Sequence, residues 1–279
     1  TVGNGNNGIR FDTVSNSSIL DVEIHTNGGN SNDAIYLGFA SQNNLVNNSL
    51  IFTNGTGDFN DGISTGDRVS SNNEFLNNII FTDGLGDNLG ISIVSDYNNI
   101  SGNVIHANGT NAGNTGISIG VGVYNNSVNL NEIVVDSVSS GTSQAIGIFG
   151  SNDNNFSKNN ISVYGSSASS ALYLDGAGNN LFENNLIIYN DGYDLEIVSF
   201  SSYPSNHLKD QVIGDYDFSF FNINGIIVED SSYGLVSFID AVTGTGTNLV
   251  GNSTSDIVFS DSAVFVNSSS NSGLNVSAN

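Results

Sequence analysis

One repeat, which returns every 25 to 30 residues, constrains this chain more than any other feature. Its clearest part is a hydrophobic residue, then usually an asparagine three positions later, then an isoleucine or leucine two positions after that. A period of this length indicates supersecondary units that bury their apolar sides only by stacking on one another. The hydrophobic residues that begin the block are Ile19, Leu45, Phe75, Ile100, Val128, Phe156, Phe182 and Leu208.

A second element, two apolar residues separated by one residue, comes earlier in each repeat. Alternation over a short run is typical of a strand, because successive side chains project to opposite faces. Gly, Asn, Ser and Asp separate the apolar runs, as turns require. Each repeat is therefore predicted to hold three short strands. The pairs are Ile9/Phe11, Ile35/Leu37, Ile63/Thr65, Ile91/Ile93, Ile117/Ile119, Ile146/Ile148, Leu172/Leu174 and Leu195/Ile197.

Three short strands in about 27 residues predict an all-β fold, a right-handed parallel β-helix of about eight coils over residues 1–214. Adjacent coils should lie about 4.8 Å apart, the ordinary strand spacing. Residues 215–279 break the repeat and are predicted to form a small β-rich C-terminal module, either a cap or an assembly element. Its expected strands are 225–229, 234–242, 256–260 and 263–267.

The asparagines of the repeat are predicted to form a ladder inside the solenoid, at a bend. Stacked side-chain amides can bond to one another and to turn backbone, as in cross-β ladders. In this register Ile24, Leu50 and Ile80 face the core. The predicted ladder is Asn48, Asn78, Asn103, Asn131, Asn159 and Asn185.

The charge balance of the chain excludes several partners. It has 27 Asp and Glu against 4 Lys and Arg, a formal charge of −23. Such a surface repels nucleic acid and anionic membranes, and no apolar run is long enough for membrane insertion. There is no cysteine for disulfides or thiolate metal sites. The composition favours an extracellular or cell-surface protein, and Thr1 in place of Met suggests a mature or excised fragment.

Eleven Asn-x-Ser/Thr sequons occur in the chain. A chain this rich in Asn and Ser forms sequons by chance, so an unmodified turn asparagine is the alternative at each one. Those expected in connecting loops or in the tail are the candidates for glycosylation: Asn54, Asn108, Asn252, Asn267 and Asn275.

The run Asn-Asn-Ile-Ser-Gly-Asn-Val-Ile at 98–105 resembles the repeat of the parallel β-helix superfamily, which includes pectate lyases, alginate epimerases and NosD-like proteins. The resemblance covers about residues 2–214 and implies the fold, not an activity. The tail, at 224–234 and 266–275, resembles the end of secreted archaeal β-helix-repeat surface proteins. That second resemblance implies an exported cell-surface protein.

The residues that lyases of this superfamily use are not gathered in this chain. A lyase needs Arg or Lys to abstract a proton and stabilise an enolate-like intermediate, and the four basic residues are scattered over separate coils. No Asp-Asp pair supports a hydrolase. His25 and His106 share an outward column, but three coils, or about 14 Å, should separate them. We therefore expect surface histidines, no enzyme and no required cofactor.

Acidic loops that precede the first strand of successive repeats offer a candidate calcium site. Stacking should place Asp33 over Asp61 and Asp58 near Asp87, with Asp83 close by. Carboxylates this close repel, and a hard cation with oxygen ligands would relieve the repulsion. Solvated acidic loops without Ca²⁺ are the alternative.

The sequence feature that departs most from a normal soluble surface is a series of hydrophobic residues at positions that should face solvent. In the strand that carries Ile24 and Ile80, alternate residues should face solvent, yet many are hydrophobic. Monomers rarely expose so long a patch, so we expect it to be covered by the tail, a ligand or another subunit. The predicted interface is Ile51, Ile79, Phe81, Val104, Val134, Leu186 and Ile188.

These features favour a non-enzymatic extracellular structural protein, at a cell surface or in a filament. It would self-associate through the predicted interface, the C-terminal module, or both. The alternative is a carbohydrate-binding protein or a polysaccharide lyase or hydrolase. Tyr36 and Tyr173 on the outer face of the first strand would then stack on sugars, although five coils separate them.

Overall fold

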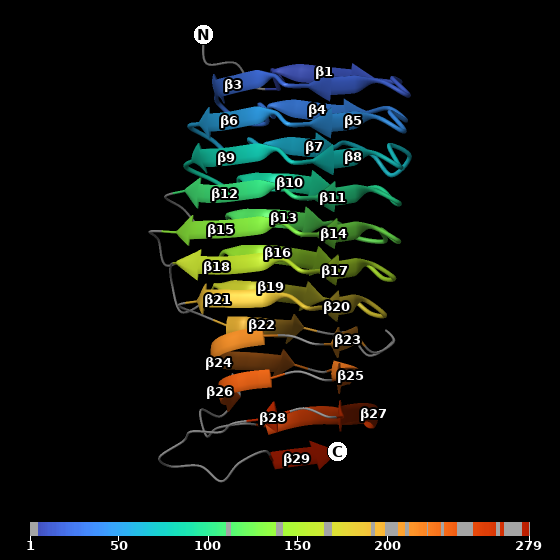
Figure 1. Ribbon diagram of the computed structural model, residues 1–279, viewed down its shortest axis with the longest axis vertical. Coiled ribbons are helices and arrows are strands. Elements are labelled where there is room, and N and C mark those ends of the chain that lie inside the picture. The colour runs from blue at the N-terminus through green and yellow to red at the C-terminus, as the bar shows by residue number, and fades with distance from the viewer. Residues whose placement is uncertain are drawn as a thin grey trace.

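The computed structural model describes residues 5–109, 113–137, 142–164 and 169–190, followed by the strands at 193–198, 206–209, 212–221, 223–229, 232–238, 248–260, 263–264 and 275–278. Beyond Ile187, side chains are described only at Asn206. The chain is an all-β parallel solenoid with three strands per coil. The coils stack along the long axis (Figure 1).

The first strand of each coil forms one parallel sheet, which we call the first sheet. Each of its strands pairs in register with the strand one coil on, for example Ile9 with Ile35 and Ile91 with Ile117. Its strands are β1 (Ile9–Asp12), β4 (Ile35–Gly38), β7 (Ile63–Thr65), β10 (Leu89–Ile93), β13 (Thr115–Ile119), β16 (Gln144–Phe149), β19 (Ser170–Asp175) and β22 (Tyr193–Val198).

The second sheet takes the middle strand of each coil and runs to the end of the described chain. It comprises β2 (Ser18–Leu20), β5 (Leu45–Asn47), β8 (Glu74–Leu76), β11 (Asn99–Ser101), β14 (Ser127–Asn129), β17 (Asn155–Ser157), β20 (Leu181–Glu183), β23 (Asn206–Lys209), β25 (Ile223–Glu229), β27 (Asn248–Ser260) and β29 (Asn275–Ala278).

The third sheet takes the last strand of each coil and carries the candidate site. Its pairing is parallel, and it is in register over whole strands up to the last pair, where the register shifts between Ile161 and Ser162. It comprises β3 (Glu23–Gly28), β6 (Leu50–Gly55), β9 (Ile79–Gly84), β12 (Val104–Gly109), β15 (Glu132–Ser137), β18 (Asn160–Tyr164) and β21 (Leu186–Asn190).

Strands after residue 211 pair in parallel with the coils before them. β24 (Val212–Phe221) pairs with both β21 and β22, so one strand continues both the third and the first sheet. β26 (Ser232–Phe238) pairs with β24, and β28 (Ala263–Val264) pairs with β26. The backbone thus continues the parallel pairing into the region predicted to be a separate module, and the domain boundary at residue 214 stays a prediction.

The predicted inward columns form the core. The apolar pairs of the first sheet are fully buried from Ile35 to Leu172, and the isoleucine column of the third sheet is buried from Ile24 to Ile187. In the second sheet Phe156 stacks on Phe182, with ring centroids 4.9 Å apart. Burial of each such side chain contributes about 1.5–3 kcal/mol, and the repeat makes the contribution recur in every coil.

The second coil departs from the predicted register by one residue. Val46 pairs with Ile19 and Phe75, and Ile51 pairs with Ile24 and Ile80, so Val46 and Ile51 are in the core. The predicted core residues Leu45 and Leu50 point outward. Each lies beside an apolar neighbour, so the hydrophobic pattern fits either register, and a slip of one residue exchanges the two faces.

The asparagine ladder is confirmed from Asn78 to Asn185. Asn103 shows the pattern: its Nδ2 donates to Asn131 Oδ1 (3.0 Å) and to the carbonyl of Phe75 (2.8 Å). Its Oδ1 accepts from the backbone N–H of Asn78 (2.9 Å) and from Asn78 Nδ2 (3.0 Å). Each amide therefore satisfies buried backbone groups of the coil before it while it bonds to the next amide.

Asn48 was wrongly placed in this ladder. It has a left-handed backbone (φ 52°) and an exposed side chain that donates to Asp21. Ser49 takes the ladder position, where its N–H donates to Asn78 Oδ1 at 3.0 Å. The reason is the same slip of one residue in the second coil.

A second amide ladder runs through the turn between the first and second sheets. Sequence reasoning assigned these asparagines to turns but not to a ladder. The residue before each is left-handed in most coils, for example Asn43, Asn72 and Asn125. The Oδ1 of each ladder asparagine after the first accepts a hydrogen bond from the backbone N–H of the ladder asparagine one coil earlier. In several coils the side-chain amides of these two asparagines also bond to each other. The ladder is Asn44, Asn73, Asn98, Asn126, Asn154, Asn180 and Asn206.

Removing one buried ladder amide should cost far more stability than removing an exposed asparagine. Asn103→Ala leaves the N–H of Asn78 and the carbonyl of Phe75 without their partners, at about 1–3 kcal/mol for each unsatisfied group. The control is Asn155→Ala on the exposed side of β17, which should change stability by less than about 0.5 kcal/mol. Urea unfolding monitored by circular dichroism measures both, and equal midpoints for the two variants would contradict the ladder's role.

Candidate functional site

The outward face of the third sheet carries three columns of side chains, because residues of one strand alternate between core and solvent. In-register pairing of β3, β6, β9, β12 and β15 then stacks equivalent residues along the axis. The first column is Glu23, Leu50, Ile79, Val104 and Glu132. The second column is His25, Phe52, Phe81, His106 and Val134. The third column is Asn27, Asn54, Asp83, Asn108 and Asp136.

Four rings of the second column form one continuous stack. The ring centroids of His25 and Phe52 are 4.6 Å apart, those of Phe52 and Phe81 are 5.1 Å apart, and those of Phe81 and His106 are 5.1 Å apart. The first two pairs are nearly parallel (17° and 7°), and the third is tilted by 30°. Parallel strands lie at almost this spacing, so the ring faces cover one another and the edges face outward.

The stack revises the interpretation of the two histidines. They share an outward column three coils apart, as predicted, but they are the ends of a ring stack rather than isolated surface residues. Phe52 was missed because the register slip in the second coil had placed it inward. Glu23, exposed in the first coil, contacts His25 Nε2 at 2.7 Å.

An outer groove with a volume of about 610 Å³ runs beside the ring stack. The second column forms one wall, and the third column, from Asn54 to Asp136, forms the other. Thr53, Thr82 and Ala107 lie between them, and Tyr164 closes one end. The groove therefore combines apolar ring edges with amide and carboxylate groups, and its lining holds no Lys or Arg.

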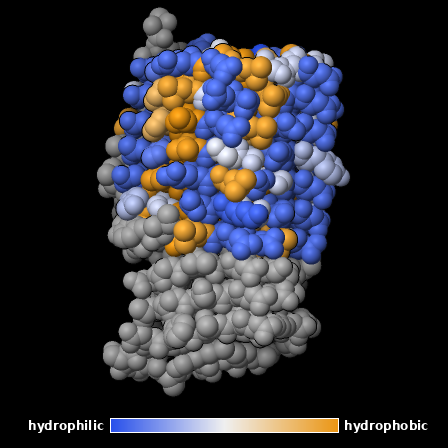
Figure 2. Space-filling view, viewed as in Figure 1, coloured by the Kyte–Doolittle hydropathy of each residue, from blue (hydrophilic) through white to orange (hydrophobic). Residues whose placement is uncertain are grey.

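Two rings of the groove wall, Phe52 and Phe81, are part of an apolar strip, which we define as Leu50, Phe52, Ile79, Phe81 and Val104. Ile79 is 42% exposed, and the other four are half-buried. Glu23 and Glu132 flank the strip in the first column. Figure 2 shows hydrophobic residues gathered in patches along the long axis, among hydrophilic neighbours.

The strip contains three residues of the predicted interface, Ile79, Phe81 and Val104. Ile79, Phe81, Val104 and Val134 point outward, and Leu186 is 36% exposed on the same sheet. Ile51 was a wrong assignment, since it is fully buried. The side chain of Ile188 lies outside the described residues.

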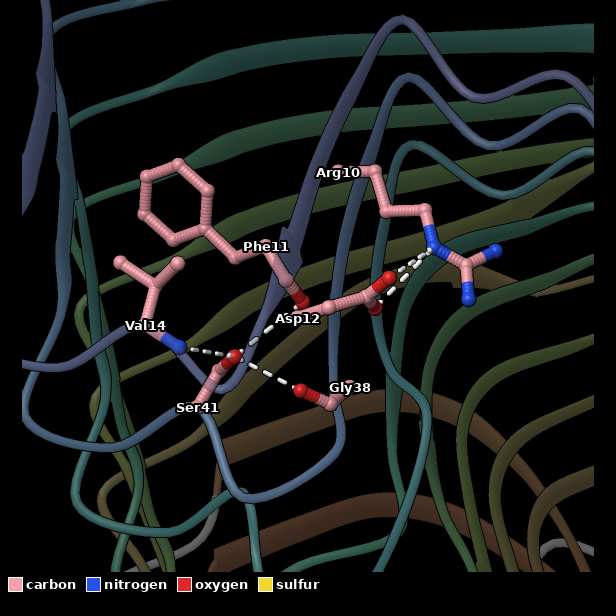
Figure 3. A network of polar contacts seen from close by, with 6 residues as sticks. All are labelled: Arg10, Phe11, Asp12, Val14, Gly38 and Ser41. Atoms are coloured by element: carbon pink, nitrogen blue, oxygen red, sulfur yellow. Dashed lines mark hydrogen bonds and ion pairs between the residues drawn. The ribbon is translucent and has the colours of Figure 1, made fainter.

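The three basic residues with described side chains, Arg10, Arg68 and Lys158, do not converge. Arg10 Nε donates to both carboxylate oxygens of Asp12 (2.8 and 3.0 Å), which raises the pKa of Arg10. Its guanidinium also lies over the Tyr36 ring, 4.9 Å from the centroid. Nearby, Ser41 Oγ donates to the carbonyls of Phe11 and Gly38 and holds the turn between sheets (Figure 3).

The other basic residues with described side chains, and the two tyrosines predicted to stack on sugars, do not line the groove. Arg68 donates to the carbonyl of Val121 in a turn, and Lys158 is in a left-handed turn. Tyr36 on β4 and Tyr173 on β19 both belong to the first sheet, and Tyr173 contacts Phe149. The side chain of Lys209 lies outside the described residues.

The acidic loops form the two pairs that the coil alignment predicted. Asp33 and Asp61 stack in adjacent coils, where the N–H of Asp61 donates to Asp33 Oδ1 at 3.1 Å. Asp58 and Asp87 form the second pair, and burial followed by the charge of Asp58 raises the pKa of Asp87. Asp83 lies in the groove instead. Among the described residues no three acidic or histidine side chains gather as metal ligands, and the Ca²⁺ site stays a prediction.

Asp33 and Asp61 are both buried, with 8% and 6% of their surface exposed. Burial raises the pKa of Asp33 to about 6. Burial, and then the charge of Asp33, raises the pKa of Asp61 well above its usual value. Each carboxylate accepts a backbone N–H from the next coil, that of Asp61 or of Leu89. Asn7 accepts the N–H of Asp33 at the equivalent position in the first coil, so an amide fits this column.

The Asp33–Asp61 pair should make the protein more stable in mild acid than at neutral pH. Because the folded pKa values are raised, the folded state binds more protons, so stability falls as pH rises from about 4 through 6. Asp61→Asn should reduce this fall and stabilise the protein at pH 7, because it removes a buried carboxylate that is costly to ionise. Asp83→Asn, in the exposed third column, is the control for lost charge. Urea unfolding from pH 4 to 8 measures this, and identical pH profiles for the two variants would exclude a special role for the pair.

Comparison of the chain with family models, with curated proteins and with solved structures finds no match. In the part of the chain that the structure describes, no helix is long and apolar enough to span a membrane.

Proposed function

We propose that this protein is a non-enzymatic, extracellular structural protein that self-associates side by side through the third sheet. The apolar strip is the observation that supports this proposal. It places five hydrophobic side chains on one flat face over three adjacent coils, and an exposed patch of this kind is typical of an interaction surface.

The occupant we propose for the strip is a second copy of the chain. In the first two columns the three coils of the strip hold no Asp, Glu, Lys or Arg, whereas Glu23 and Glu132 lie above and below. An apolar centre with a charged rim is the usual anatomy of a protein interface. Two such sheets could pack face to face at about 10 Å, with their side chains interdigitated.

The net charge opposes this association. Each chain carries a formal charge of −23, so two copies repel over the whole surface. Salt reduces the repulsion between exposed charges, since the Debye length falls to about 3 Å at 1 M. Burial of the strip is affected much less by salt. We therefore expect association to increase with ionic strength.

Placing a charge in the strip should abolish association. Phe81→Asp or Ile79→Asp would bury an unpaired carboxylate between two sheets, which is strongly unfavourable. The control is Ser118→Asp, which adds the same charge to the outward face of the first sheet in β13. Sedimentation velocity of the unglycosylated proteins at 0.1 M and 1 M NaCl should show larger species for wild type and Ser118→Asp only. Unchanged assembly of Phe81→Asp would refute the strip as the interface and leave the C-terminal module as the assembly element.

The outer groove favours a second candidate function, the binding of a glycan. Asn54, Asp83 and Asn108 offer donors and acceptors opposite apolar ring edges. Asp83 and Asp136 lie two coils apart, or about 9.6 Å at the ordinary strand spacing, near the carboxylate separation of inverting glycosidases. Against this candidate, the ring faces that would stack on sugars are covered by one another.

Titration calorimetry with neutral and uronic oligosaccharides separates the two candidate functions. Glycan binding predicts saturable heat that Asp83→Asn and Asn108→Ala weaken, because both side chains line the groove. Hydrolysis or elimination products that disappear in Asp83→Asn would support an enzyme. Self-association as the main function predicts neither binding nor turnover.

A further inference from the structure

Two identical Asn-Gly-Thr sequons occupy equivalent places on the third sheet. Asn54 and Gly55 end β6, and Asn108 and Gly109 end β12 in the same way. Both asparagines pair in register with Asp83, which lies between them on β9. Both side chains are exposed and line the outer groove. The sequence predicted loops at these sites, whereas the structure places both asparagines in strands.

These two asparagines differ from those that hold the coils together. Ladder amides are buried and bonded on both sides, as Asn103 is. The sequon side chains of Asn47 and Asn99 bond to asparagines of a neighbouring coil. Asn54 and Asn108 form no side-chain hydrogen bond within the described residues, so a group attached to Nδ2 displaces no structural contact.

From this placement we infer that Asn54 and Asn108 are N-glycosylation sites whose occupancy controls self-association of the third sheet. The inference rests on the proposed function. Asn54 lies two residues after Phe52 on the same face of β6, so its glycan would project beside the apolar strip. Sheets that pack face to face are only about 10 Å apart, and that space cannot hold a bulky, hydrated carbohydrate.

The modification is a group transfer with a defined balance. The donor is a lipid-linked oligosaccharide phosphate supplied by the secretory apparatus. Asparagine Nδ2 forms a bond to the anomeric carbon, the bond from that carbon to the phosphate oxygen breaks, and the lipid phosphate leaves. The amide loses one proton, and no redox change occurs.

The other described sequons provide a matched control. Asn155 is exposed on β17 of the second sheet, away from the strip. A glycan there leaves the third sheet free to associate. Asn160 lies on β18 of the third sheet, two coils beyond His106. Glycan at Asn160 is therefore measured separately from glycan at Asn54 and Asn108. Asn252 and Asn275 lie on strands without described side chains, and Asn267 lies outside the described residues.

The test compares chains secreted by a host that attaches N-glycans. Peptide mapping by mass spectrometry should find glycan on Asn54 and Asn108, and the wild type should sediment as a single small species. Asn54→Asp with Asn108→Asp should shift most of the protein to larger assemblies, as should wild type made without glycosylation. Asn155→Asp should remain small. The two added carboxylates oppose association, so a gain cannot come from charge.

Two outcomes would overturn the inference alone: unmodified peptides at both sites, or assemblies of the same size from the glycosylated wild type and the double variant. If the unglycosylated chain and the double variant both fail to assemble, the proposed function itself is overturned. Mass mapping of Asn54 and Asn108 then still decides whether they are modified.

Discussion

The buried amide ladders are the interactions on which the rest of this structure depends. A coil of about 27 residues must turn sharply three times, and each turn brings backbone N–H and carbonyl groups into the interior. An unsatisfied buried group costs about 1–3 kcal/mol, so these groups need partners in every coil. The Asn103 side chain forms four hydrogen bonds, two to backbone groups and two to neighbouring ladder amides. The amide has two N–H donors and a carbonyl acceptor, whereas serine has a single donor and ionised aspartate has none.

The register that stacks the buried amides also stacks the outward side chains, which differ in type from coil to coil. Because an inner column such as Ile24, Ile51 and Ile80 must align, the alternate residues align too. The ring stack from His25 to His106 and the groove beside it follow from that alignment. Packing in the core thus fixes the positions of the strip residues on the outer face. It does not require those residues to be hydrophobic. That difference is why we assign the strip to self-association.

The sequence repeat correctly predicted the features that its period determines. Three strands per coil, the isoleucine columns and most of the asparagine ladder follow from residue types that recur at fixed positions. It failed where two neighbouring residues fit one position equally, at Leu50 and Ile51. That one slip hid Phe52 and with it the ring stack. It also exchanged Asn48 for Ser49.

Other features depend on geometry that a repeat pattern does not contain. The stacking of Asp33 on Asp61 was predicted from the coil alignment, but their burial was not, because it depends on how the loops fold inward. The groove volume likewise depends on side-chain directions across six strands. The alignment of Asn54 and Asn108 on one face could have been found from the sequence had the second coil been placed in the correct register.

Electron microscopy of the unglycosylated chain at high concentration and high salt tests the central claim most directly. Our account predicts solenoids that lie side by side, joined across their third sheets, in pairs or more extended arrays. Dispersed single particles under these conditions, or solenoids joined only end to end, would contradict it.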